Sequence, residues 1–324
     1  TASGQVAIGD GRTLTITGSG TTTLSGTGAS QTTLGSGTTL NYTGTGSSSI
    51  ADLALAGSSV NKTGAGSFTV TALSSTGSSS VTTSTGSTTV NALTVTSGTL
   101  ALSGAGSYTV GTSIVTGTLT DSSATTLTGD MTIDATGSAS LSGATSLNPG
   151  VDFFNNNSLS VTNLTTVSAG TLSRVVAGAT ATSTTLGTVN VTGHDLSLES
   201  SAGTFQVTGA TTVASGKTLS MSGSGTIAMD GTTVAGTLTD TAALVDFTGT
   251  LTVQSTGSAT VASLLLEPGV GITNSGGSFT AASGTITTAG MGTASTIASS
   301  GSGTTSLAGI SVPVATHDLI LNNT

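Results

Sequence analysis

The chain lacks cysteine and tryptophan, and it has few charged or aromatic residues. Only 5% of its 324 residues are charged, against about 25% in ordinary globular proteins. The absence of cysteine excludes disulfides, zinc–thiolate centres, iron–sulfur clusters and thiol catalysis. A chain of this length needs no disulfides if stacked repeats supply its stability.

Positive charge is also scarce. The formal net charge is −9, and the four basic residues lie far apart, at Arg12, Lys62, Arg174 and Lys217. Nucleic-acid binding requires clustered Lys and Arg that neutralise phosphates, so nucleic acid is excluded as a partner. An anionic membrane surface would repel the chain. No apolar run approaches the about 18 residues of a transmembrane helix, so we expect no membrane insertion.

Apolar and polar residues alternate with a period of two through much of the chain. Residues 13–17 (Thr-Leu-Thr-Ile-Thr) place the apolar side chains on one face, and residues 219–221 (Leu-Ser-Met) repeat the pattern. This alternation predicts short, half-buried β-strands, and the glycine-rich segments between them predict turns. Low charge and recurrent Thr and Val argue against disorder.

The chain contains a tandem duplication. Residues 97–161 align with residues 216–281 at an offset of 119 or 120 residues, so that Gly117–Asp121 matches Gly236–Asp240. The repeat divides the chain into an irregular first block (1–96) and two related blocks (97–215 and 216–324), each of the latter about 120 residues long.

The repeat continues without any segment that would close it into a barrel. It therefore favours an all-β fold of the parallel β-helix (β-solenoid) type rather than a sandwich or a closed barrel. We expect a single elongated unit over residues 1–324. With an assumed length of about 22 residues per coil, the chain would make about 15 coils. At about 4.8 Å per coil, these coils would form a rod of about 70 Å.

Residues 98–119 carry the most specific motif. It begins with Gly98–Leu100 (Gly-Thr-Leu), continues with Gly104–Thr109 (Gly-Ala-Gly-Ser-Tyr-Thr), and ends with a second Gly-Thr-Leu at Gly117–Leu119. This motif resembles the passenger-domain repeat of bacterial autotransporters, although Val110 stands where that family prefers glycine. The broader pattern is similar to filamentous-haemagglutinin-type adhesins. The resemblance implies a right-handed β-helix, secretion across an outer membrane, and a role in adhesion, aggregation or biofilm formation.

The two histidines are candidate site residues because each precedes an aspartate. His194-Asp195 and His317-Asp318 lie at an offset of 123 residues, and the first block has Ala51-Asp52 instead. A His–Asp pair could belong to a catalytic or metal site. The repetition instead favours a structural reading, in which each aspartate holds a turn by binding local backbone.

The acidic residues are dispersed. Asp121 and Asp240 are repeat equivalents, and Asp130 is matched by Thr250. Asp130 and Asp134 are close enough in sequence to suggest weak Ca²⁺ binding, but calcium needs about six to eight oxygens. Glycan-cleaving β-helix enzymes need clustered carboxylates. We therefore predict no catalytic, cofactor-binding or metal-binding residues, no cofactor and no enzymatic activity.

Proline, glycine and asparagine mark turns and possible modification sites. Asn148-Pro149-Gly150 and Glu267-Pro268-Gly269 predict β-turns, and Asn155–Asn157 suggests either a stacked asparagine ladder or a loop. Asn-x-Ser/Thr sequences make glycosylation possible where the host can perform it. These sequences begin at Asn41, Asn61, Asn156, Asn163, Asn190 and Asn322.

These features predict an extracellular structural protein of a microbial cell surface. Because the chain begins with Thr1 and carries no signal-peptide pattern, we expect that a leader was removed or that the chain is part of a longer one. The segments 5–8 and 319–321 read as strands without a partner at either end, which predicts head-to-tail polymerisation into a filament or sheath. The alternative is a stalk segment of an autotransporter-type adhesin, with host-cell or matrix glycans as binding partners. A carbohydrate-acting β-helix enzyme is the third hypothesis.

Overall fold

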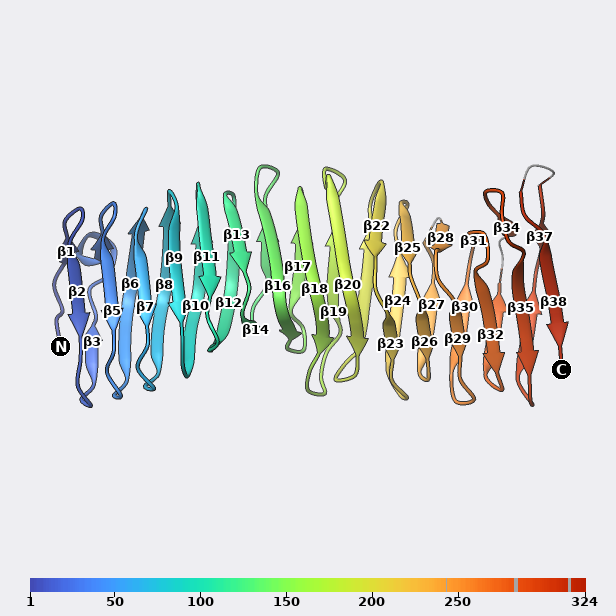
Figure 1. Ribbon diagram of the computed structural model, residues 1–324, viewed down its shortest axis with the longest axis horizontal. Helices are drawn as coiled ribbons and strands as arrows, with labels where there is room; N and C mark the ends of the chain where they lie inside the picture. Colours follow the sequence, from blue (N-terminus) through green and yellow to red (C-terminus); the bar gives the residue numbers. More distant parts are fainter. Residues whose placement is uncertain (243, 283–284, 314–315) are drawn as a thin grey trace. The chain divides into compact units, whose positions relative to one another are not determined.

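The computed structural model describes residues 1–242, 244–282, 285–313 and 316–324. The chain is a β-solenoid of about 14 turns, built as a parallel sheet of stacked coils. It divides into two compact units, residues 1–162 and 163–324, and Figure 1 shows the strands of each unit lying side by side. The all-β parallel fold expected from the sequence is confirmed. No described helix is long and apolar enough to cross a membrane.

Unit 1 contains one short 3-10 helix, η1 (Gly28–Ser30), and the first strands of the chain. These strands are β1 (Val6–Ile8), β2 (Thr13–Ile16), β3 (Thr22–Leu24), β4 (Thr32–Leu34), β5 (Thr39–Tyr42), β6 (Ser48–Ala56), β7 (Ser59–Lys62), β8 (Phe68–Thr76), β9 (Ser79–Thr83), β10 (Ser87–Val95), β11 (Thr99–Ser103), β12 (Ser107–Val115), β13 (Thr118–Asp121), β14 (Ala124–Leu127), β15 (Met131–Ile133), β16 (Ser138–Leu147) and β17 (Asp152–Asn155). Strand β18 (Ser158–Thr166) follows them along the chain.

The coils of unit 2 have three faces, each a ladder of parallel strands. Face 1 consists of β19 (Ser173–Ala177), β21 (Leu196–Ser200), β24 (Thr218–Ser222), β27 (Thr237–Asp240), β30 (Ser258–Val261), β33 (Ser278–Ala281) and β36 (Thr304–Leu307). Face 2 consists of β22 (Thr204–Val207), β25 (Thr226–Met229), β28 (Leu244–Phe247), β31 (Leu264–Leu266), β34 (Ile286–Thr288) and β37 (Ile310–Ser311). Face 3 consists of β23 (Thr211–Val213), β26 (Thr232–Val234), β29 (Leu251–Val253), β32 (Gly271–Ser275), β35 (Ser295–Ser300) and β38 (Leu319–Asn323). Strand β20 (Ser183–Val191) begins both faces 2 and 3.

The coil length varies because the turns differ in length. Successive coils are offset by as few as 17 residues, between Ser107 and Ala124, and by as many as 26 residues, between Val6 and Thr32. The turn count of about 14 is close to the count expected from a uniform coil of about 22 residues.

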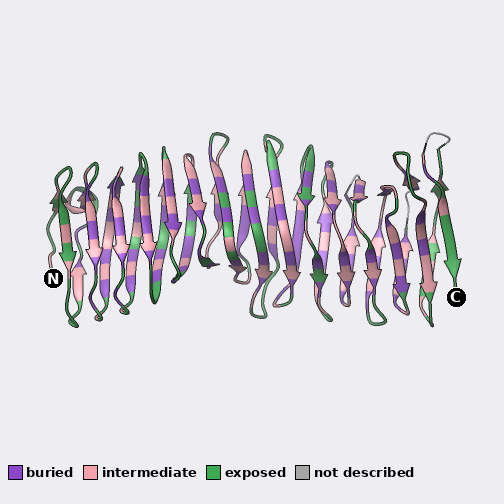
Figure 2. Ribbon diagram, in the orientation of Figure 1, coloured by how far each residue is buried: buried purple, intermediate pink, exposed green. Residues whose placement is uncertain are grey.

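Buried residues recur along the strands of successive coils (Figure 2), and the core is a stack of their inward apolar side chains. On face 1, Leu219 pairs with Leu238, Leu238 with Ala259, and Ala259 with Phe279, and all four are fully buried. Because successive strand residues point to opposite faces, each such strand places small polar residues outward. The alternation in the sequence is thus the inside–outside pattern of the coil.

Candidate functional site

Each histidine forms a buried pair with a serine of the preceding coil. Nε2 of His194 lies 2.9 Å from Oγ of Ser173, and Nδ1 lies 3.1 Å and 3.2 Å from the carbonyl oxygens of Val167 and Ser168. The histidine and the serine are both buried. Since Nδ1 faces two acceptors, this nitrogen must carry the proton.

His317 has the same surroundings. Its Nε2 lies 2.8 Å from Oγ of Ser295, and its Nδ1 lies 3.0 Å and 3.3 Å from the carbonyl oxygens of Ala289 and Gly290. Both residues of this pair are also buried.

The Ser–His distances fall within the range of a catalytic nucleophile and its base, but the rest of the arrangement is structural. The Asp195 carboxylate does not orient the ring; it accepts the backbone N–H of Thr218 in the next coil at 2.8 Å, rather than the local backbone that the sequence suggests. The ring of His194 is held by backbone carbonyls instead, and its pair is shielded from solvent. Each imidazole therefore links two consecutive coils.

The two pairs occupy different faces of unit 2. His194 precedes β21 on face 1, whereas His317 precedes β38 on face 3. Segments that are equivalent in sequence therefore stand at different corners of the coil. The third segment differs again, because Asp52 lies within β6 and its carboxylate accepts the N–H of Gly28 at 2.9 Å.

The repeat-equivalent aspartates Asp121 and Asp240 each hold a turn with a buried carboxylate. Asp121 accepts the N–H of Ser123 at 2.9 Å and the hydroxyl of Thr125. Asp240 accepts the N–H groups of Ala242 and Ala262 at 2.6 Å and 3.0 Å. Burial raises the pKa of both carboxyls, because it disfavours the charged form.

These buried acids predict an unusual pH dependence of stability. Burial, followed by the nearby Glu267, also raises the pKa of Asp246, whose Oδ1 is buried without a hydrogen-bond partner. A raised pKa means that the folded state binds more protons than the unfolded state above pH 3.8, so stability falls as pH rises through this window. We expect a higher melting temperature at pH 4 than at pH 7, and a smaller difference in the Asp246→Asn variant. A melting temperature that drops on acidification would contradict this assignment.

Asp130 and Asp134 do not converge on a common ligand. Oδ1 of Asp130 accepts the N–H of Asp152 at 2.9 Å, and Oδ2 of Asp134 accepts the hydroxyl of Thr116 at 3.1 Å. The two carboxylates flank opposite ends of β15. Within the described ranges, no three His, Cys, Asp or Glu side chains form a group that could hold a metal ion.

The two Pro-Gly segments are β-turns, as the sequence predicts. Val151 donates to the carbonyl of Asn148 at 3.2 Å and Val270 to that of Glu267 at 3.1 Å. Gly150 and Gly269 have φ angles of 77° and 78°, as the third position of a type II turn requires.

The sequence suggests an asparagine ladder or a loop at Asn155–Asn157, and the structure places Asn156 and Asn157 in the connection between β17 and β18. Asn155 is buried at the end of β17 and pairs with Ile133, while Asn157 donates to the carbonyl of Gly137 at 2.7 Å. One contact between stacked asparagines lies between Asn61 and Asn41, where Nδ2 donates to Oδ1 at 3.1 Å. Both members of this contact begin Asn-x-Thr sequences.

Sequence reasoning missed one buried cation. Lys62 stacks between Tyr42 and Thr83 in inward positions and is fully buried. Its Nζ donates to the carbonyl of Gly64 at 2.7 Å and to that of Thr85, and burial lowers its pKa. The alternation that places Val60 inward also places Lys62 inward, so the signal was present in the sequence.

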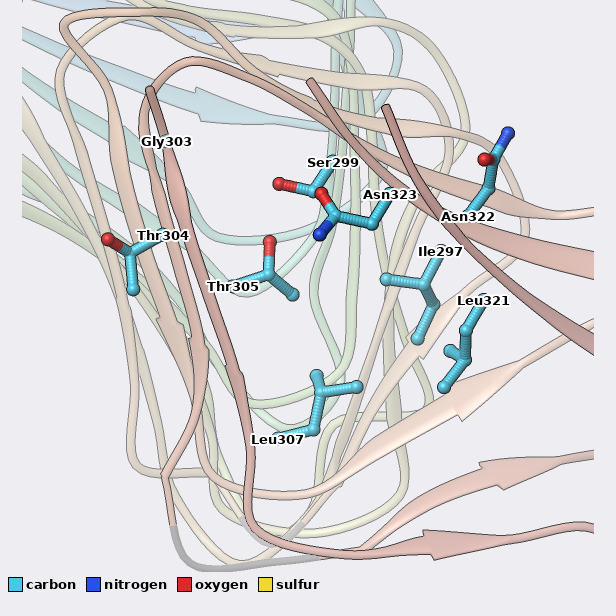
Figure 3. A pocket seen from close by; sticks show the side chains of 9 residues that line it. All are labelled: Ile297, Ser299, Gly303, Thr304, Thr305, Leu307, Leu321, Asn322 and Asn323. Carbon is cyan, nitrogen blue, oxygen red and sulfur yellow. The ribbon is translucent and has the colours of Figure 1, made fainter. Parts of the chain in front are cut away.

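The last coil leaves a hollow of about 420 Å³ at its open end (Figure 3). Its apolar part is formed by Ile297 of β35, Leu307 of β36 and Leu321 of β38. Leu321 is 57% exposed, although it pairs with the buried Ile297. The side chains of Ser299, Thr305 and Asn323 lie beside them, whereas Thr304 and Asn322 line the rim with side chains that point away from the hollow (Figure 3). The hollow is the interior of a coil that no described strand covers.

No protein-family model, curated protein or solved structure matches this chain.

Proposed function

We propose that the chain is a non-catalytic structural protein of the microbial cell surface, exported from the cell, whose solenoid stacks end to end on further copies. The observation that carries this proposal is the uncovered interior at the last coil, with Leu307 and Leu321 in positions that are buried in the coil before. Apolar interior positions and unpaired strand edges favour the addition of another strand layer.

The first coil offers complementary surfaces. Among the described strands, β1 and β2 each pair on one side only, with β4 and β5, and their inward residues are only half-buried. The first coil consists of β1, β2 and β3 in chain order, and the last coil consists of β36, β37 and β38. A second copy can therefore place its β1 on β36, its β2 on β37 and its β3 on β38, and continue each parallel ladder.

The second candidate is a stalk segment of an adhesin, with which a β-solenoid is also consistent. In that case the open coil would receive a further coil of the same polypeptide, and isolated copies would not associate. A carbohydrate-acting enzyme is less favoured, because the buried carboxylates of Asp121 and Asp240 accept hydrogen bonds from backbone N–H groups in turns.

Single cysteines test the contact directly, since the chain has none of its own. Ser306 and Ala7 occupy outward central positions of β36 and β1. Cα atoms on adjacent parallel strands lie about 4.8 Å apart, within disulfide range. We expect a mixture of Ser306→Cys and Ala7→Cys chains to give a covalent dimer on oxidation.

The matched control mixes Ser306→Cys with Ser140→Cys, an exposed position within unit 1. This mixture should give only background cross-linking. Equal yields from the two mixtures, or no dimer from either, would favour the stalk.

A further inference from the structure

Face 1 of unit 2 carries a two-row lattice of hydroxyl groups. The first and third residues of β24, β27, β30, β33 and β36 are all Ser or Thr, from Thr218 and Ser220 in β24 to Thr304 and Ser306 in β36. The strand registers align each row across all five coils without a slip. We call these ten residues the hydroxyl lattice.

The hydroxyl lattice is available to solvent. Eight of its members are half-buried, and the two on the last coil, Thr304 and Ser306, are exposed. In the described part of the chain, Ser220 is the one member whose hydroxyl donates to protein, to the carbonyl of Leu196 at 3.5 Å. Each remaining hydroxyl can donate one hydrogen bond and accept two from water.

Face 2 shows that the abundance of Ser and Thr in the sequence does not by itself produce such regular rows. The outward row of face 2 mixes amide, methyl, carboxylate and large apolar side chains in successive coils. Its members are Thr185, Gln206, Ala228, Asp246, Leu265 and Thr287. Unit 1 also has a regular row of hydroxyls. One of its outward rows holds only Ser or Thr over seven coils, from Thr23 in β3 to Ser146 in β16.

We propose that the hydroxyl lattice binds ice. Hydroxyls in one row repeat at the coil spacing of about 4.8 Å, and the two rows lie about 6.6 Å apart. In a tetrahedral water network, two waters bonded to a common third lie about 4.5 Å apart, because each O–H···O bond is about 2.75 Å long. Waters held along a row therefore stand within a few tenths of an ångström of an ice repeat.

The chemistry of the face favours ice over other extended partners. No member of the hydroxyl lattice is charged, so no ionic hydration shell competes with a tetrahedral network. Aromatic side chains dominate the energetics of many interfaces, but the aromatic residues of unit 2 are Phe205, Phe247 and Phe279, and all three are fully buried. Six of the ten members are threonines, whose methyl groups add apolar surface to the lattice.

The test is thermal hysteresis and inhibition of ice recrystallisation by the purified chain. We expect both activities in the wild type and their loss in the Thr239→Lys/Thr260→Lys variant, where two long charged side chains stand on the lattice. The matched control is Thr287→Lys, an outward central position of face 2, which should keep full activity. Circular dichroism melting establishes that each variant is folded.

If the double variant does not fold, Thr260→Val replaces it, since valine removes the hydroxyl but keeps the shape; reduced activity is then expected. Absence of activity in the wild type overturns the proposal, as does equal loss in Thr287→Lys. Pull-down by crystalline cellulose or chitin without any effect on ice would assign the face to a polysaccharide instead. None of these outcomes depends on end-to-end assembly.

Discussion

Replacing Leu321 with aspartate is expected to abolish end-to-end association. Leu321 stands in the hollow of the last coil and is 57% exposed in the single chain, so the substitution should leave the monomer folded. In a stacked pair the carboxylate would be buried without a partner, at a cost of about 3 kcal/mol or more. At about 1.4 kcal/mol per tenfold change, association should weaken about a hundredfold or more.

Sedimentation velocity over a range of concentrations measures this effect. The matched control is Met291→Asp, which adds the same charge at a side chain that is 83% exposed and does not line the hollow. Association that survives Leu321→Asp unchanged would show that the last coil is not the contact surface.

Replacing Gly223 with alanine is expected to destabilise unit 2 strongly. Gly223 has a φ of 108°, and a Cβ at this position would lie 2.1 Å from the carbonyl oxygen of Ser200 in the preceding coil. The left-handed backbone conformation costs an alanine about 1 kcal/mol, and the forced displacement of packed backbone costs about 2 kcal/mol more. We expect a loss of about 3 kcal/mol in the free energy of unfolding.

Gly216→Ala separates the two causes. Gly216 also has a positive φ, 73°, but a Cβ there would meet no atom within 4 Å. Its replacement should cost only the conformational term, about 1 kcal/mol. Urea denaturation of both variants measures the difference, and equal losses would mean that close coil contact at Gly223 is not the cause.

The period-two pattern made the fold predictable. The Leu-Ser-Met segment at 219–221 is an inward–outward–inward strand of face 1, as its alternation indicates. The turns at Gly150 and Gly269 were predictable for an equally local reason, since Pro-Gly selects a type II turn.

The corner of the coil that each residue occupies was not predictable from the sequence. His194 and His317 match in sequence but lie at different corners, because turn lengths vary and the duplication is not a whole number of coils. The Ser173 and Ser295 partners are 21 and 22 residues away from their histidines, a separation that becomes meaningful only when the local coil length is known. The hydroxyl lattice likewise emerges only from strand register, since Ser and Thr are abundant throughout the sequence.

Negative-stain electron microscopy of the purified chain, at micromolar concentration and after dilution, tests the proposed end-to-end assembly most directly. Stacking of β1 on β36 predicts unbranched fibres of constant width that shorten on dilution. Separate particles of single-chain size at every concentration would contradict it and would favour the adhesin stalk.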